Sequence, residues 1–275
     1  IRRLKQFLTS VYKRQHSTDP IWHLTANDPT ITRKNIDLYL FLNVQCNVPD
    51  SGNIKKYAGN IDELLDFEPR RKIWEITHQL RRSDFLTDSG HDDQEIIRID
   101  ALLMKANDFK FVSSFGSYVR PRENKRLSIL TKVITKIMQH QVDSASNYDV
   151  VYRSLFSWLR DNGALKSMNN VLIITDGSHD IEIYMRNSFY RSHLSFPYWM
   201  RSYVDMKKLF QKFYKIRTKG VVRMNLYKSL YLLELPYFRC ECCPTGVISV
   251  VNLARLAKAI HDDNCCLANI KFTCA

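Results

Sequence analysis

An acidic residue after a short apolar segment is the first candidate for chemistry in this 275-residue sequence. The apolar run that starts at Val171 ends in Thr175-Asp176-Gly177-Ser178, and an amphipathic segment begins with Asp180. This pattern predicts a buried strand, a tight turn and a helix with an acid in its first turn. Asp180 then either stabilises the helix N-terminus or supplies a carboxylate at the carboxyl end of a strand, where open α/β sheets place their sites.

Basic residues are concentrated between Arg201 and Arg239, with ten Lys and Arg against two acids, in a chain of net charge +13. Such an excess favours a polyanionic partner, usually nucleic acid. Aromatic rings alternate with these cations and could stack on bases, although their helical spacing equally suits rings that point into a core. The candidate nucleic-acid-binding cations are Lys207, Lys208, Lys212, Lys215, Arg217, Lys219 and Arg223, and the rings are Phe210, Phe213, Tyr214 and Tyr227.

Seven irregularly spaced cysteines do not predict a disulfide framework, and reduced thiols favour a cytoplasmic or nuclear protein. Cys240, Cys242 and Cys243 cluster, but their spacing only half fits the paired ligands of a structural zinc site. Free thiols are the alternative for this cluster. No apolar run approaches the twenty or so residues that span a bilayer, so we expect no membrane partner.

The first 70 residues are predicted to form a small helical N-terminal extension. Apolar spacing predicts helices over 2–14, 32–44 and 53–67, separated by loops that contain proline. Paired short helices of this kind resemble a degenerate SAP-type nucleic-acid module. A helical extension that only packs on the main domain is the alternative.

Residues 71–275 are predicted to form the main domain, because strand and helix patterns alternate there. Strands over 95–105 and 109–120 form a hairpin that turns at Asn107-Asp108. Further strands are expected from Val171 and over 203–206. Helices are expected over 148–162, where Gly163 ends the helix, and over 207–214, 225–233 and 250–261. This order predicts an α/β fold with an RNase H-like mixed sheet and helices on both faces.

Several motifs resemble the Eri-type 3′-5′ exoribonucleases, the histone-mRNA three-prime exonuclease branch of the DEDDh, DnaQ-like superfamily. Six segments carry the resemblance in the family's order over about 190 residues. They are Gln94-Glu95-Ile96-Ile97, Tyr118-Val119-Arg120-Pro121, Gln139-His140-Gln141-Val142-Asp143, Thr175-Asp176-Gly177-Ser178-His179-Asp180, Val204-Asp205-Met206-Lys207-Lys208 and Asn252-Leu253-Ala254-Arg255-Leu256. The resemblance implies a five-stranded mixed sheet and a nuclease site.

The family's site needs four carboxylates that hold two divalent ions, Mg²⁺ or Mn²⁺, and a histidine that acts as general base. In this sequence Asp180 takes the third acid position. We match the first strand's Asp-Phe-Glu to Asp84-Phe85-Leu86, which keeps the Asp and loses the Glu. The histidine and last acid fall on Pro244 and Ser249. The resemblance therefore leaves Asp84 and Asp180 as the retained catalytic and metal positions.

Two acids cannot hold two metal ions as four do, and proline has no side-chain base. We therefore predict a catalytically inactive exonuclease relative, without a metal cofactor, that binds a single-stranded or stem-loop RNA 3′ end or a protein in RNA processing or RNA interference. An active metal-dependent 3′-5′ exoribonuclease with an altered site is one alternative. A protein-interaction scaffold is the other.

Overall fold

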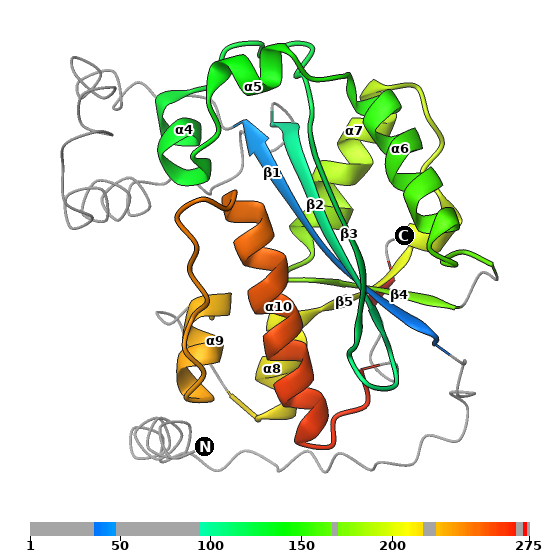
Figure 1. Cartoon of the computed structure of the whole chain (residues 1–275), viewed down its shortest axis with the longest axis vertical. Helices are drawn as coiled ribbons and strands as arrows, with labels where there is room; N and C mark the ends of the chain where they lie inside the picture. Colours follow the sequence, from blue (N-terminus) through cyan, green and yellow to red (C-terminus); the bar gives the residue numbers. More distant parts are fainter. Residues whose placement is uncertain (1–35, 48–93, 167–169, 217–223, 268–271, 274–275) are drawn as a thin grey trace, which may run out of the picture.

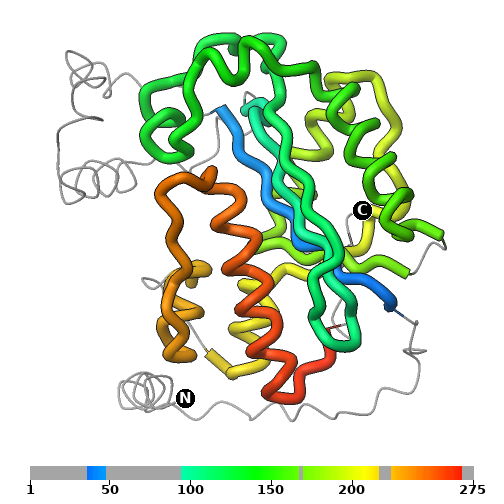
Figure 2. Tube along the Cα trace, in the orientation of Figure 1, coloured from blue at the N-terminus to red at the C-terminus, as the bar shows by residue number. Residues whose placement is uncertain are grey.

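The computed structural model describes residues 36–47, 94–166, 170–216, 224–267 and 272–273. They form one mixed sheet of strand order β3-β2-β1-β4-β5-β6 (Figures 1 and 2). β1 runs parallel to β4, and β4 to β5, while the other neighbouring pairs are antiparallel. The strands are β1 Leu38–Asn47, β2 Glu95–Lys105, β3 Phe111–Tyr118, β4 Val171–Thr175, β5 Ser202–Asp205 and β6 Phe272–Thr273.

This topology confirms the predicted RNase H-like fold, to which the two-residue edge strand β6 adds a sixth strand. The predicted hairpin is β2 and β3, and its turn contains Asp108, whose carboxylate accepts a hydrogen bond of 3.0 Å from the backbone N–H of Lys110.

β1 corrects the prediction for the N-terminal region. We expected a helix over 32–44, but Leu38–Asn47 is a strand in the middle of the sheet. Leu40 and Leu42 face one apolar layer while Tyr39 and Phe41 face the other, so this strand is apolar on both faces. That continuous run resembles a helical pattern. The other two predicted helices, and the boundary proposed near residue 70, lie outside the described residues.

Two helical layers cover the sheet, and each buries its own apolar core. On one face lie α8 Met206–Phe213, α9 Leu226–Leu232 and α10 Thr245–Asp262 (Figure 1). On the other lie α6 Tyr148–Asp161, the π-helix η2 Asp180–Met185 and α7 Arg186–Arg191. The shorter helices are α4 Ile129–Thr135, α5 Gln139–Asp143 and the 3₁₀ turn η3 Tyr198–Met200.

Three helices predicted in the main domain, over 148–162, 207–214 and 225–233, are confirmed within one or two residues. The helix α6 ends at Asp161, and Gly163 follows with φ 77°, a left-handed conformation that glycine adopts without strain. In contrast, α10 begins at Thr245, five residues before the predicted start, and Pro244 takes its N-cap position. None of the helices in the described part of the chain combines the length and apolar character needed to span a bilayer.

Candidate functional site

The candidate site lies where β1 meets the start of η2. Asn43 and Gln45 are two residues apart on β1, and side chains at this spacing point to the same face of a strand. The backbone N–H of Val44, between them, donates a hydrogen bond to the carboxylate of Asp180. The acid predicted from the strand–turn–helix pattern therefore lies directly against the central strand.

The first residues of α10 lie against this site and contact β1. Nε2 of Gln45 donates a hydrogen bond to Oγ1 of Thr245, and Oγ1 of Thr245 donates to the carbonyl oxygen of Thr135 at 2.8 Å. A Cβ atom at Gly246 would lie 1.9 Å from Oδ2 of Asp100 and 3.3 Å from Oδ1 of Asn43. Only glycine allows so close an approach of the helix to β1 and β2.

A buried ion pair lies beside Asn43. Asp100 stands opposite Asn43 in the β1–β2 pairing and is fully buried. Nε and Nη2 of Arg98 each donate to one oxygen of the Asp100 carboxylate at 2.7 Å, and the Arg98 guanidinium lies 4.4 Å from the centre of the Tyr118 ring. Burial raises the pKa of Asp100, and the bonds from Arg98 oppose that rise. Both carboxylate oxygens of Asp100 therefore already accept a hydrogen bond from Arg98.

The remaining acids near Asp180 are also paired. Nζ of Lys207 lies 3.0 Å from a carboxylate oxygen of Asp176. Asp205 caps α8 by accepting a 3.0 Å hydrogen bond from the backbone N–H of Lys208, whose Nζ lies 3.6 Å from the second oxygen. These contacts hold α8 against the ends of β4 and β5.

Asp180 lies in a poorly hydrated position, although part of the residue surface remains accessible. Desolvation is the main reason that the pKa of Asp180 is well above its usual value, and the negative charge of Asp176 raises it further. Lys207 and the Val44 N–H act in the opposite direction but do not cancel the shift. The carboxyl group therefore holds its proton to a higher pH than a solvated Asp does.

Two buried amide oxygens in the site have no hydrogen-bond partner in the described part of the chain, Oδ1 of Asn43 and Oε1 of Gln45. Each is an oxygen that a hard cation could accept as a ligand. Both are uncharged, however, and the amide nitrogen of Gln45 is held by Thr245.

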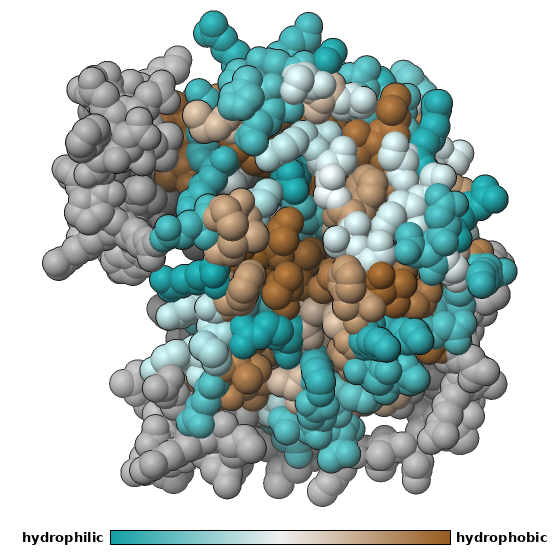
Figure 3. Space-filling model, viewed as in Figure 1, coloured by the Kyte–Doolittle hydropathy of each residue, from teal (hydrophilic) through white to brown (hydrophobic). Residues whose placement is uncertain are grey.

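This residue set does not fit the two-ion centre that the DEDDh pattern implies. Asn43 and Gln45 occupy the first strand with the spacing of the family's Asp-x-Glu, and Ser249 donates its hydroxyl to the carbonyl oxygen of Thr245 at 3.0 Å. Pro244 is the N-cap of α10. One carboxylate, from Asp180, remains to balance the four positive charges of two divalent ions. On the face shown in Figure 3, apolar side chains gather in the middle, over α10.

β1, the strand that pairs with β4 and contacts Asp180, carries Asn43-Val44-Gln45, whereas the sequence led us to match the family's first strand to Asp84-Phe85-Leu86. Asp84 and Leu86 themselves lie outside the described residues. The sequence did carry a signal for β1, since apolar residues alternate with the two polar ones from Leu42 to Cys46.

The described part of the basic segment contains cations in ion pairs and further exposed cations. Lys207 and Lys208 form the ion pairs described above, whereas Lys212 and Lys215 are exposed on and just after α8. Three other predicted cations, Arg217, Lys219 and Arg223, lie outside the described residues. Phe210 is fully buried, and Phe213 and Tyr214 pack against the same core, so these rings are structural.

Tyr227 differs from those rings, because it is half exposed and borders a pocket of about 230 Å³. Its ring centre lies 5.6 Å from that of Tyr237, at an interplanar angle of 50°. Burial raises the pKa of Tyr237, and Asp176 lies near enough to raise it further. The residues that line the pocket are Tyr227, Tyr231, Glu234, Leu235, Pro236 and Tyr237.

Comparisons with known proteins agree with this fold. The RNase_T family model, described as Exonuclease, matches residues 85–235. The 3'-5' exoribonuclease 1 of Rattus norvegicus is 28% identical over 173 residues, which are 62% of this chain and 48% of that protein. The chain thus spans about half the length of the curated relatives of this name.

Two solved structures share the architecture at low sequence identity. The nuclease domain of 3'hExo, a DEDDh family member bound to rAMP, has a TM-score of 0.61 and 21% identity, covering 84% of this chain and 94% of that one. A 3'-exonuclease solved in 3'-end-specific recognition of a histone mRNA stem-loop has a TM-score of 0.63 and 20% identity, covering 88% and 92%.

Proposed function

This chain belongs to the RNase_T exonuclease family, and we propose that it binds RNA 3′ ends without hydrolysing them. The observation that carries this proposal is the charge of the site. Of the four positions where the family holds carboxylates, Asp180 alone is acidic, while Asn43, Gln45 and Ser249 are neutral.

The nearby acids do not compensate for this loss. Asp100 is held through both oxygens by Arg98, and Asp176 is paired with Lys207. An acid that a protein cation already neutralises contributes little to holding a divalent ion. A general base is also missing from the family's histidine position, which Pro244 occupies.

RNA binding needs neither the metal-binding carboxylates nor the general base that hydrolysis needs. Lys212 and Lys215 are exposed cations that can contact phosphates, and the half-exposed ring of Tyr227 offers a stacking surface beside the pocket. One structural neighbour of similar fold was solved with an RNA stem-loop, which makes a 3′ end the ligand class to test first. RNA processing or small-RNA regulation is the setting that fits such a protein.

The test is incubation of the full chain with single-stranded and stem-loop RNA, each labelled at the 5′ end so that 3′ shortening stays visible, in Mg²⁺ or Mn²⁺. We expect no shortening and a salt-dependent complex on a native gel. Shortening that disappears in Asp180→Asn would instead identify an active metal-dependent exonuclease. Absence of both shortening and complex would overturn RNA binding and favour a protein-interaction scaffold.

A further inference from the structure

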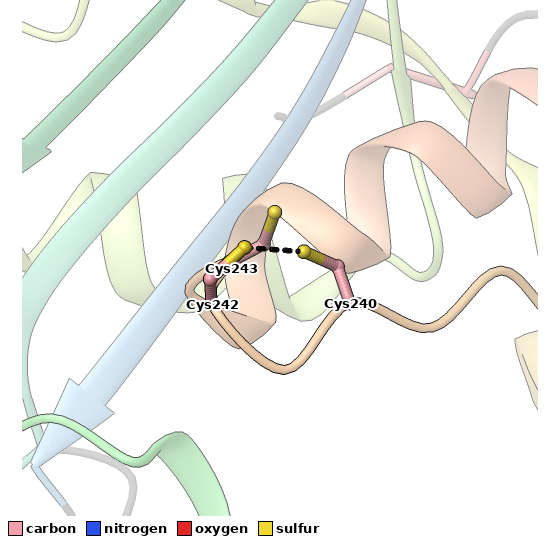
Figure 4. Close-up of side chains that lie close together, drawn as sticks. All are labelled: Cys240, Cys242 and Cys243. Carbon is pink, nitrogen blue, oxygen red and sulfur yellow. Dashed lines mark hydrogen bonds between the residues drawn. The ribbon is translucent and has the colours of Figure 1, made fainter.

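Three cysteine thiols meet in the loop before α10. The Sγ atoms of Cys240, Cys242 and Cys243 all lie within 4.8 Å of one another, and those of Cys240 and Cys242 are 3.0 Å apart (Figure 4). Within the described residues this is the one group of three potential metal-ligating side chains that approach so closely. The sequence pattern Cys-x-Cys-Cys suggested such a cluster but could not show that the three thiols converge.

The loop that carries these thiols is anchored on both sides. Before it, the side chain of Asn252 donates to the carbonyl oxygen of Phe238 at 2.9 Å and accepts from its backbone N–H at 2.8 Å. Arg255 donates to the carbonyl oxygen of Pro236 at 2.6 Å. After the loop, α10 begins at Thr245. The segment before the cysteines and the helix after them are therefore both held in place, which restricts the loop between them.

The spacing of the sulfur atoms suits a single metal ion. Zn–S bonds of about 2.3 Å in tetrahedral geometry place sulfur atoms roughly 3.8 Å apart. The Cys240–Cys242 pair must then open by less than about 1 Å, which side-chain rotation in an exposed loop permits. Carboxylates are absent from the cluster, and soft thiolates select Zn²⁺ or Cu⁺ over Mg²⁺ or Mn²⁺.

We propose that Cys240, Cys242 and Cys243 form a three-thiolate site for one soft, closed-shell metal ion, Zn²⁺ or Cu⁺. Binding releases the thiol protons and forms three metal–sulfur bonds, and an external ligand completes the fourth position in the Zn²⁺ case. The ion would rigidify the loop that precedes Pro244. This proposal is independent of RNA binding and of hydrolysis, since neither enters its test.

The test is titration of the reduced, metal-free full chain with Co²⁺, a spectroscopic substitute for Zn²⁺. We expect one Co²⁺ per chain, with sulfur-to-metal charge-transfer bands and the visible absorption of tetrahedral cobalt, both of which Zn²⁺ abolishes. Parallel titration with Cu⁺ in the absence of oxygen, using a colorimetric chelator as competitor, shows which of the two ions binds more tightly.

The matched variants are Cys242→Ser and Cys266→Ser. Cys242 and Cys266 are both exposed, but Cys266 lies beyond the far end of α10, roughly 27 Å along that helix. We expect Cys242→Ser to weaken binding of Zn²⁺ at least about 100-fold, since loss of outer-sphere support alone costs 10- to 100-fold. Cys266→Ser should bind like the parent chain.

Circular dichroism of both variants separates metal loss from misfolding, and the exposed position of Cys242 makes serine a mild change there. Absence of a sulfur-based spectrum in the reduced parent chain would overturn the proposal. Equal weakening by the two variants would also overturn it, because the ligands would then not be this cluster.

Discussion

Nε2 of Gln45 donates a hydrogen bond to the hydroxyl oxygen of Thr245, which in turn donates to the carbonyl oxygen of Thr135. This chain of bonds joins β1, α10 and α4. Gln45 thus helps to hold α10 and α4 on β1, and we expect the stability of the fold to depend on this chain of bonds.

Thr245→Val should lower the free energy of unfolding by about 1–3 kcal/mol, because it leaves the Gln45 amide without its acceptor in a buried setting. Thr245→Ser, which keeps the hydroxyl, is the control and should lose much less. Urea denaturation measures both. Equal stability of the valine variant and the parent chain would mean that this bond contributes nothing.

Arg98→Ala should destabilise the fold by about 3–5 kcal/mol at neutral pH, because it leaves the buried Asp100 carboxylate unpaired. The loss should shrink at acid pH, where Asp100 takes up a proton and becomes neutral. Arg98→Ala/Asp100→Asn should recover part of the stability at neutral pH. Denaturation curves at two pH values test this, and a loss that does not depend on pH would contradict it.

Asp180→Asn should stabilise the protein at neutral pH. The folded-state pKa of Asp180 is raised, so its contribution to stability is present below the unfolded-state pKa and is lost as the pH rises through the folded-state value. Asparagine removes this loss while keeping an acceptor for Val44. A folded-state pKa that lies one pH unit above the unfolded-state value corresponds to a loss of about 1.4 kcal/mol.

Thermal melts of Asp180→Asn against the parent chain from pH 4 to pH 7.5 check this prediction. The melting temperature of the variant should gain on the parent as pH rises, by roughly 2–4 °C for each kcal/mol. Asp108→Asn, at an exposed acid in the β2–β3 turn, is the control and should show no such gain. A variant that becomes relatively less stable with rising pH would contradict the prediction.

Gly246→Ala should destabilise the fold by about 1–3 kcal/mol, although alanine normally favours a helix over glycine. The added Cβ would lie 1.9 Å from the buried Asp100 carboxylate, so the ion pair or the helix must shift. Ser154→Ala, on the exposed face of α6, is a helix-propensity control that should change stability little. Chemical denaturation that finds Gly246→Ala stabilising would refute this packing.

Lys212→Ala/Lys215→Ala should weaken RNA binding and reduce the slope of log affinity against log salt by roughly 1.4, since each phosphate contact on a single strand contributes about 0.7. The charge-matched control is Arg160→Ala/Lys166→Ala, at exposed cations at the end of and just after α6 on the other face of the sheet. Fluorescence anisotropy over a salt series measures both. Equal effects of the two double variants would show that binding is not localised at α8.

The sequence predicted the elements whose signals are local. The β2–β3 hairpin has a turn signal between alternating segments, and α6 has an apolar stripe and Gly163 at its end. Asp180 was found because a strand, a turn and an acid follow one another within ten residues.

The central strand was missed because its local signal, the alternation from Leu42 to Cys46, is short. β1 is separated from its antiparallel partner β2 by a long stretch of chain, and its two-sided burial gives an apolar run that also suits a helix. The convergence of the three thiols likewise depends on Asn252 and Arg255 of α10, which anchor the segment before the cysteines. Without β1 the site could not be assembled, because Asn43 and Gln45 carry no charge that marks them in a sequence.

We infer that this site does not hold the two divalent ions of an active exonuclease. Mn²⁺ is the best probe, because it prefers oxygen ligands and avoids the thiolates of the loop before α10. Electron paramagnetic resonance of free Mn²⁺, titrated into the full chain, measures retention directly. Asn43→Asp/Gln45→Glu/Ser249→Asp, which restores the acids, provides a variant with the charge for two ions.

We predict that the parent chain retains no pair of Mn²⁺ ions, that Asp180→Asn leaves the titration unchanged, and that the acid-restored variant, if folded by circular dichroism, binds Mn²⁺ more tightly than the parent chain does. Retention of two Mn²⁺ ions per parent chain, lost in Asp180→Asn, would contradict this prediction and show that a working metal centre is built around this single acid.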